Sequence, residues 1–138
     1  MQLDHITFIN AFPLGVVATI QSDGNPSAAL IGMAATDTGE VLFCAKSDGR
    51  TLRNLHQHSR IAVVFTDGDT TSLQVEGDAR IPVEDDLAAC LDAWLAANPT
   101  SGISKPESDL VLLAVQPAWV RQYSVTTGTP AILEYNVS

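Results

Sequence analysis

The chain has few basic residues and no long apolar run, and these shortages exclude several kinds of partner. Its seven Lys and Arg residues are outnumbered by 16 Asp and Glu, which leaves a net charge of −9. Nucleic acids and anionic membrane surfaces select basic proteins, so we expect the chain to bind neither. No apolar run approaches the roughly 18 residues of a membrane-spanning helix. Because the N-terminal segment has an early Asp and lacks the basic start of a signal peptide, we expect a cytoplasmic protein.

Cysteine is scarce as well, which argues against a disulfide framework or a zinc site. Cys44 falls in an apolar strand pattern and Cys90 in a helical pattern, and there is no CxxC motif. Isolated cysteines of this kind are typical of reduced, buried thiols. His56 and His58 are two positions apart and would lie on different faces of a helix. We therefore predict no metal site.

Apolar runs separated by turn residues predict one domain, residues 1–138, that is mainly β with inserted helices. Strands are expected at 15–20, 27–35, 41–45, 61–65, 72–81, 109–115 and 118–125, the last two separated by a break at Gln116 and Pro117. Helices are expected over 3–11, over 49–57 and from 84 to a stop at Asn98. Gly77 interrupts a strand pattern and indicates a bulge or a close backbone approach. Tight turns favour an antiparallel sheet that curls into a barrel.

Four of the seven basic residues gather within residues 41–65, and this is the strongest indication of function in the sequence. They are Lys46, Arg50, Arg53 and Arg60. The turn KSDGRT at 46–51 brings cations, hydroxyls and a glycine to the start of a helix. Free backbone N–H groups and the positive end of the helix dipole can hold a phosphate there. A strand-to-helix turn also needs polar residues and a cap when it binds nothing, so the pattern leaves both interpretations open.

The helix that begins near residue 84 carries an apolar stripe and an acidic start, and neither predicts catalysis. The stripe consists of Leu87, Cys90, Leu91, Trp94 and Leu95. Their spacing places them on one face, with Trp94 as a core anchor. The acidic start is Glu84, Asp85 and Asp86, which complement the helix dipole. We find no nucleophile–base pair and no carboxylate pair at a recognisable spacing, so catalytic residues remain unknown.

Three segments, taken in order, resemble a known family. They are SDGRTLRNL (47–55), SRIAVVF (59–65) and VEGDAR (75–80). Together they resemble the FMN-binding split barrels of the pyridoxamine 5′-phosphate oxidase-like superfamily over residues 3–124, which leaves a tail at 126–138. The resemblance implies an antiparallel split β-barrel that forms a homodimer. It also implies FMN, or in some branches a deazaflavin or heme, in a groove between the subunits.

The resemblance also implies cofactor-binding positions, and several of them differ from the family's oxidases. The implied positions are Ala29, Leu30, Ile31, Ala45, Lys46, Ser47, Arg50, Thr51 and Ser72. Arg50 is kept, but Ala29 and Ala34 occupy the positions of an Arg and a Lys. The other replacements are Cys44 and Ala45 for an aromatic–Thr pair, Thr51 for a Lys and Ser72 for a Gln. The C-terminal Trp-Arg-Leu ending of true pyridoxamine phosphate oxidases is absent.

These observations lead to three functional hypotheses. The first is an FMN-dependent oxidoreductase with an unknown substrate, which is not a pyridoxamine phosphate oxidase. The second is a cofactor-free homodimeric module that binds a small molecule or another protein, and the missing polar positions favour it. The third is a deazaflavin- or heme-binding relative, in which His5, His56 or His58 would be the axial ligand of heme.

Overall fold

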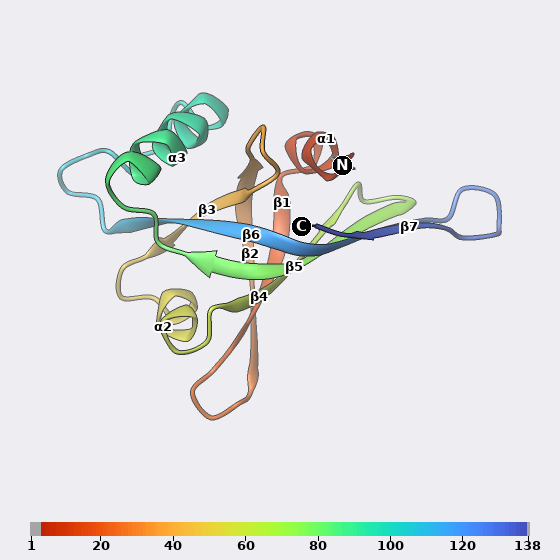
Figure 1. Ribbon diagram of the computed structural model, residues 1–138, viewed down its shortest axis with the longest axis horizontal. Coiled ribbons are helices and arrows are strands. Elements are labelled where there is room, and N and C mark those ends of the chain that lie inside the picture. The colour runs from red at the N-terminus through yellow and green to blue at the C-terminus, as the bar shows by residue number, and fades with distance from the viewer. Residues whose placement is uncertain (1–3, 138) are drawn as a thin grey trace.

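The computed structural model describes residues 4–137 as one antiparallel sheet with three helices (Figure 1). The helices are α1 (Asp4–Ala11), α2 (Arg50–Gln57) and α3 (Glu84–Ala97). The strands are β1 (Leu14–Ile20), β2 (Pro26–Ala35), β3 (Val41–Lys46), β4 (Arg60–Thr66), β5 (Thr71–Arg80), β6 (Leu110–Ser124) and β7 (Ala131–Asn136). No helix within residues 4–137 is long and apolar enough to cross a membrane.

The sheet closes into a barrel because β3, the first strand in the order, also pairs with β6. The strand order is β3-β2-β1-β4-β5-β6-β7, and β3 pairs with β6 as well as with β2. The first part of β6 pairs with β3, from Leu110 opposite Lys46 to Val115 opposite Val41. Its second part pairs with β7, while β5 follows its other edge. Six strands therefore form the antiparallel split β-barrel that the resemblance implies, and β7 extends it.

The core lies inside the barrel and is built by alternation along the strands. Val17, Val63 and Val75 are opposite one another on β1, β4 and β5 and point inward. Phe43 and Phe65 are completely buried between them and the other strands. Such alternation gives each strand one face for the core and one face for the outside.

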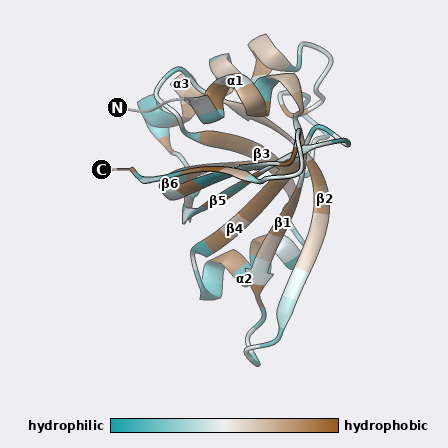
Figure 2. Cartoon of the chain, turned by 90° about the vertical axis from the view of Figure 1, so that its right-hand side faces the viewer, coloured by the Kyte–Doolittle hydropathy of each residue, from teal (hydrophilic) through white to brown (hydrophobic). Residues whose placement is uncertain are grey.

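The helices lie at the two ends of this barrel (Figures 1 and 2). α2 closes one end, where Leu52 and Leu55 enter the barrel core. α1 and α3 lie at the other end, and Trp94 of α3 packs in a second buried cluster with Leu42 and Ala114. The Arg80 guanidinium pairs with Glu40 and with Asp86, at 2.9 Å, and so joins α3 to the start of β3 and the end of β5.

The structure confirms the expectation for Gly77 and corrects the one for Pro117. The register of β5 with β6 shifts between Glu76 and Gly77, and a Cβ added to Gly77 would lie 2.1 Å from the Gln116 carbonyl oxygen. The predicted break at Gln116–Pro117 is wrong, because β6 is continuous through Pro117. β5 pairs with β6 on both sides of Pro117, while on the other edge Pro117 falls between the segment that pairs with β3 and the segment that pairs with β7. A residue without an N–H is tolerated at such an unpaired edge position. The tail that the sequence left without structure forms β7.

Candidate functional site

The turn between β3 and α2 presents unpaired backbone donors. Gly49 is the N-cap of α2 and provides no side-chain hydrogen bond, and no acidic residue lies in the first turn. The first backbone bond of the helix runs from Arg53 N–H to Gly49 O at 3.2 Å. The N–H groups of Arg50, Thr51 and Leu52 therefore have no acceptor among the described residues. At α3, by contrast, Glu84, Asp85 and Asp86 already supply negative charge to the first turn.

Short hydrogen bonds fix the conformation of this turn. Ser47 N–H donates to Asp109 O at 2.7 Å, and Gly49 N–H donates to Lys46 O at 2.9 Å. Arg53 Nη1 donates to Asp48 O at 2.9 Å. Lys46 lies 3.6 Å from Asp109 in an exposed ion pair, which stabilises little. The turn is thus attached to the residue that precedes β6.

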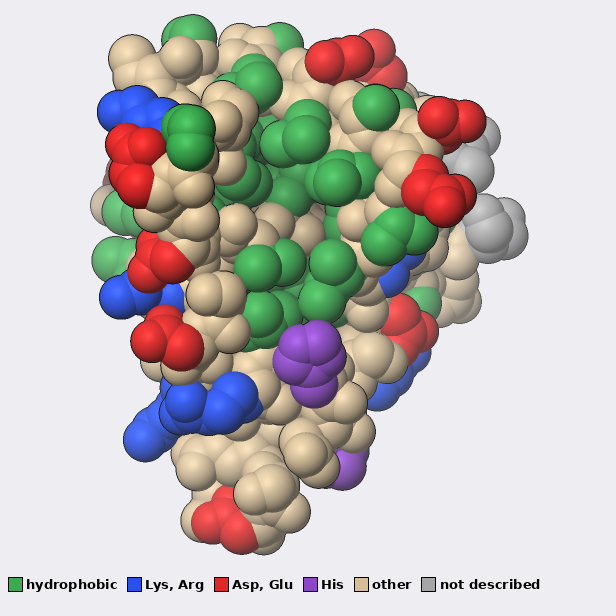
Figure 3. Space-filling view, turned by 90° about the vertical axis from the view of Figure 1, so that its left-hand side faces the viewer, with side chains coloured by type: hydrophobic (Ala, Val, Ile, Leu, Met, Phe, Trp, Pro, Cys, Tyr) green, Lys and Arg blue, Asp and Glu red, His purple; other side chains and the backbone are tan. Residues whose placement is uncertain are grey.

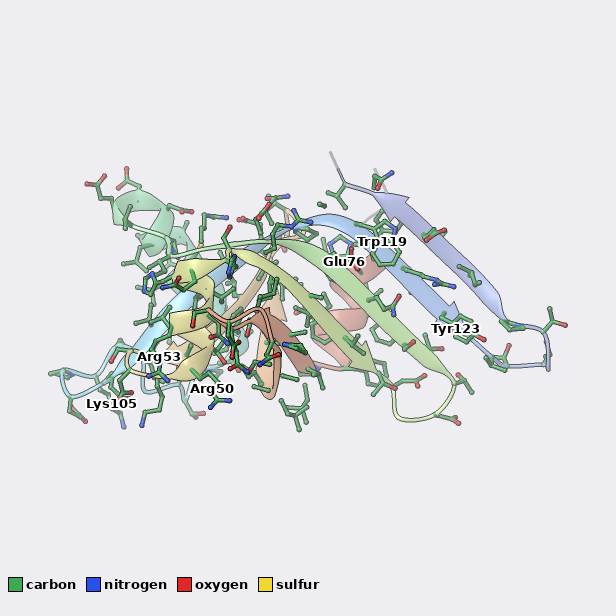
Figure 4. All side chains as sticks on the ribbon, turned by 90° about the horizontal axis from the view of Figure 1, so that it is seen from below. Arg50, Arg53, Glu76, Lys105, Trp119 and Tyr123 are labelled. Atoms are coloured by element: carbon green, nitrogen blue, oxygen red, sulfur yellow. The ribbon has the colours of Figure 1, made fainter. Side chains whose placement is uncertain are left out.

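Arg50 is the cation of this turn that is free to bind a ligand. Its side chain is exposed and makes no hydrogen bond or ion pair with residues 4–137. Figure 4 shows Arg50 and Arg53 extending from α2, far from Trp119 and Tyr123 on β6. Uncapped N–H groups, a free guanidinium and the hydroxyls of Ser47 and Thr51 together form a site that suits a phosphate group.

The predicted positions on β2 lie on a strand that separates from β3. β2 pairs with β3 only from Met33 to Ala35, so the segment from Pro26 to Gly32 has β1 on one side and no strand on the other within the described chain. Ala29 and Ile31 are half-buried, whereas Leu30 is 64% exposed. This free edge offers unpaired backbone N–H and C=O groups.

Two other predicted positions lie apart from the turn or inside the core. Ala45 is 7% exposed and packs in the barrel core, so only its backbone is near the surface. Ser72 lies toward the opposite end of β5 from α2, paired with Thr66 and Tyr123. One chain brings Ala45–Thr51 together and leaves Ser72 remote from them.

Ser72 shares its face of the sheet with Trp119, Arg121 and Tyr123 of β6. In the sequence, only the alternation of these three residues with their neighbours indicates that they share a face. Glu76 is opposite Trp119, and Ser72 is opposite Tyr123. Between these aromatic residues lies Arg121, 5.9 Å from the centre of the Tyr123 ring. Its Nε atom is buried and has no hydrogen-bond partner within residues 4–137. This row of side chains lies on the outside of the barrel (Figure 4).

Apolar side chains also line a hollow on the side of the molecule where α3 lies above α2 (Figures 1 and 3). One cavity of about 280 Å³ is lined mainly by Leu87, Leu91, Ile103, Leu110 and Leu112 with Ile81 and Pro82. A neighbouring cavity of about 210 Å³ shares Ile81 and is lined by Leu52, Leu55 and His56. A further cavity of about 530 Å³ lies between α1, β2 and α3. None of these three includes Lys46 or Arg50.

The ionisable side chains near these sites include no activated nucleophile. Burial raises the pKa of the Cys44 thiol to about 11, which keeps it neutral. His5 is buried, and its ring nitrogens contact the Tyr135 hydroxyl at 2.8 Å and the Gly39 carbonyl at 3.0 Å. Neither nitrogen is therefore free for a metal. His56 and His58 are exposed, and no group of three potential metal ligands gathers within residues 4–137.

Solved structures with the same fold belong to proteins with different names. A heme binding protein from Mycobacterium smegmatis has a TM-score of 0.80 and 20% identity, and the match covers 97% of this chain and 57% of that one. This chain thus spans little more than half of that protein's length. General Stress Protein 26 from Bacillus anthracis has a TM-score of 0.68 and 18% identity, with 96% and 97% covered. An F420 reductase has a TM-score of 0.63 and 22% identity, with 82% and 93% covered.

Identities this low show a shared fold and do not transfer a ligand. No curated protein sequence matches the chain. A family model described as pyridoxamine 5′-phosphate oxidase matches residues 4–124, which include the whole barrel from β1 to β6. The protein therefore belongs to the pyridoxamine 5′-phosphate oxidase family.

Proposed function

We propose that the protein binds FMN and acts as a flavin-dependent oxidoreductase with a substrate other than pyridoxamine phosphate. The observation that carries the proposal is the start of α2, where three unpaired N–H groups and the free Arg50 guanidinium meet and the first helical turn contains no acidic residue. A flavin phosphate is a dianion that needs such donors. When bound, the flavin would supply hydride or electron transfer.

The chain's own residues divide into a phosphate part and a ring part. The Arg50 guanidinium can donate hydrogen bonds to two phosphate oxygens, and Lys46, Ser47 and Thr51 lie around it as further donors. The free edge of β2 near Ala29 and Ile31 can offer backbone hydrogen bonds to the polar edge of a flavin ring. Ala29 and Ala34 add no side-chain hydrogen bonds to the ring, so we expect weaker binding than in the family's oxidases.

We further propose that the functional unit is a homodimer. Lys46, Ser47 and Arg50 are exposed, so the phosphate site lacks an outer wall. The outer face of the barrel carries exposed apolar side chains: Leu14, Val16, Ile20, Leu30 and Val64. Val16 is opposite both Leu30 and Val64, so these side chains form one patch. A second copy would cover this patch, and its Ser72 face could complete the site.

The experiment that tests the phosphate site compares FMN with riboflavin, which lacks the phosphate. Arg50→Ala should weaken FMN binding by about 1.5–3 kcal/mol, which is roughly tenfold to a hundredfold, and leave riboflavin unchanged. Arg60→Ala is the matched control, because its guanidinium is exposed on β4 and pairs with Asp78. Equal FMN affinity in wild type and Arg50→Ala would remove the phosphate role, and equal losses for both ligands would mean a damaged fold.

Heme is the second candidate, favoured by His56. This exposed histidine borders the hollow formed by Leu52, Leu55 and Ile81, where an apolar macrocycle could pack beside an imidazole. A similar fold occurs in the heme binding protein from Mycobacterium smegmatis. Visible absorbance after reconstitution separates the candidates: flavin bands support the first proposal, a Soret band lost in His56→Ala supports heme, and no colour supports a cofactor-free module.

A further inference from the structure

One buried polar contact fixes α2 on the barrel. Asn54 Nδ2 donates to Thr19 Oγ1 at 3.0 Å. Asn54 is 6% exposed and Thr19 is 4% exposed, and His5 is the only other polar residue in the described chain that is buried to this degree. A buried amide that loses its acceptor costs free energy. The helix is therefore most stable in the position that keeps this hydrogen bond.

The apolar contacts of α2 do not fix its position by themselves. Leu52 and Leu55 enter the core side by side, and hydrophobic contact is non-directional, so their burial constrains the rotation of the helix less sharply than a hydrogen bond does. The Asn54–Thr19 bond is directional and joins α2 to β1. It therefore sets both the rotation and the height of the helix on the end of the barrel.

The position of Asn54 makes this bond relevant to the proposed ligand. Asn54 follows Arg50 by one helical turn, about 6 Å along the axis, so a rotation of α2 at Asn54 moves the N–H groups of the first turn. The other attachment of the turn is the Ser47 N–H···O Asp109 bond next to β6. The phosphate site is thus held between two strands, with β6 on one side and β1 on the other.

We infer that Thr19 and Asn54 are a positioning pair for the phosphate-binding turn; this inference rests on the proposed FMN function. Neither side chain touches the phosphate. The pair acts by aiming the N–H groups of residues 50–52 and the Arg50 guanidinium at one point, so that binding does not have to order them.

The test uses a near-isosteric change that removes one hydroxyl. In Thr19→Val the Asn54 amide loses its acceptor, and FMN affinity should fall about tenfold while riboflavin affinity changes less than about twofold. Thr19→Ser restores the hydroxyl and should restore FMN affinity. Leu112→Val is the control for general destabilisation, because Leu112 is buried in the cluster under α3, which contains no α2 residue.

A second, ligand-free measurement separates this inference from the proposed function. Backbone amide shifts and hydrogen exchange of residues 50–52 should change in Thr19→Val, recover in Thr19→Ser and stay unchanged in Leu112→Val. Unchanged amides, or a lower melting temperature with an unchanged FMN-to-riboflavin affinity ratio, would make the pair purely structural and overturn the inference. If wild type binds FMN and riboflavin equally, the proposed phosphate site fails, and the amides alone decide whether the pair positions the turn.

Discussion

Burial of the Cys44 side chain makes its thiol less reactive. It lies on β3 next to the proposed phosphate turn, and burial raises its pKa from 9.0 to about 11. Two pKa units reduce the thiolate fraction at pH 8 about a hundredfold, so in Cys90→Ala protein a thiol reagent should modify Cys44 slowly until the chain is unfolded. Reaction at the rate of a free thiol in the folded protein would contradict this.

The same shift predicts a dependence of stability on pH. The pKa is higher in the folded state, so the unfolded thiol ionises first. The contribution of Cys44 is therefore complete below pH 9 and is lost as the pH rises toward 11. Replacing the residue in Cys44→Ala should flatten the fall of the unfolding free energy between these values, measured by urea unfolding at each pH. An identical slope in both proteins would show that Cys44 does not titrate as described.

Gly77 is required by the close approach of two backbones. A methyl group there would lie 2.1 Å from the Gln116 carbonyl oxygen, so β5 or β6 must move to accept it. Gly77→Ala should lower the unfolding free energy by about 3 kcal/mol. Gly32 on β2 is the matched control, since a Cβ added there meets nothing within 4 Å. Gly32→Ala should change the unfolding free energy by less than about 1 kcal/mol. Chemical unfolding of both variants checks this, and equal effects would refute the close approach.

Among the elements, α3 depends on a single large side chain. Trp94 is 6% exposed, and its Nε1–H donates to Ser101 Oγ at 3.0 Å, which attaches the following loop to the helix. Trp94→Ala should lower the unfolding free energy by about 3–5 kcal/mol, through lost burial and the cavity left behind. Ser101→Ala removes only the hydrogen bond and should cost about 1 kcal/mol. A melting temperature unchanged in Trp94→Ala would mean that the helix face is wrongly identified.

Elements were predictable where local pattern and tertiary environment agree, and β6 shows where they do not. The alternation in β5 and the stripe of α3 correspond to buried faces, and Cys90 and Trp94 of that stripe are buried. Pro117 locally signals a break, yet β6 continues because β5 pairs with it on both sides of Pro117, while its partner on the other edge changes from β3 to β7. Which strands are neighbours across a barrel is a long-range property that no local window contains. The tail at 126–138 contains β7 for the same reason, because its partner β6 is chosen by the tertiary fold.

At the scale of the whole molecule, the predicted site divides into a local part and a remote part. The local part is the proposed phosphate turn: Lys46, Ser47, Arg50 and Thr51 are consecutive or nearly so, and they therefore lie together in the structure. That they bind a phosphate stays a prediction. Ser72 lies at the far end of β5, so its role needs a second subunit and stays a prediction. The sequence does not predict a surface formed by Trp119, Arg121 and Tyr123, because their partners on β5 are distant in sequence.

The assembly is the last prediction. Light scattering should give about twice 14.6 kDa, because the outer face of β1, β2 and β4 exposes Leu14, Val16, Leu30 and Val64 as one patch. Leu30→Asp places a charge in the middle of this patch and should yield monomers. Val83→Asp is the matched control, since Val83 is 63% exposed against 64% for Leu30 but lies before α3, away from the patch. A wild-type mass near 14.6 kDa would contradict the homodimer, and a dimer that survives Leu30→Asp but not Val83→Asp would place the interface at α3.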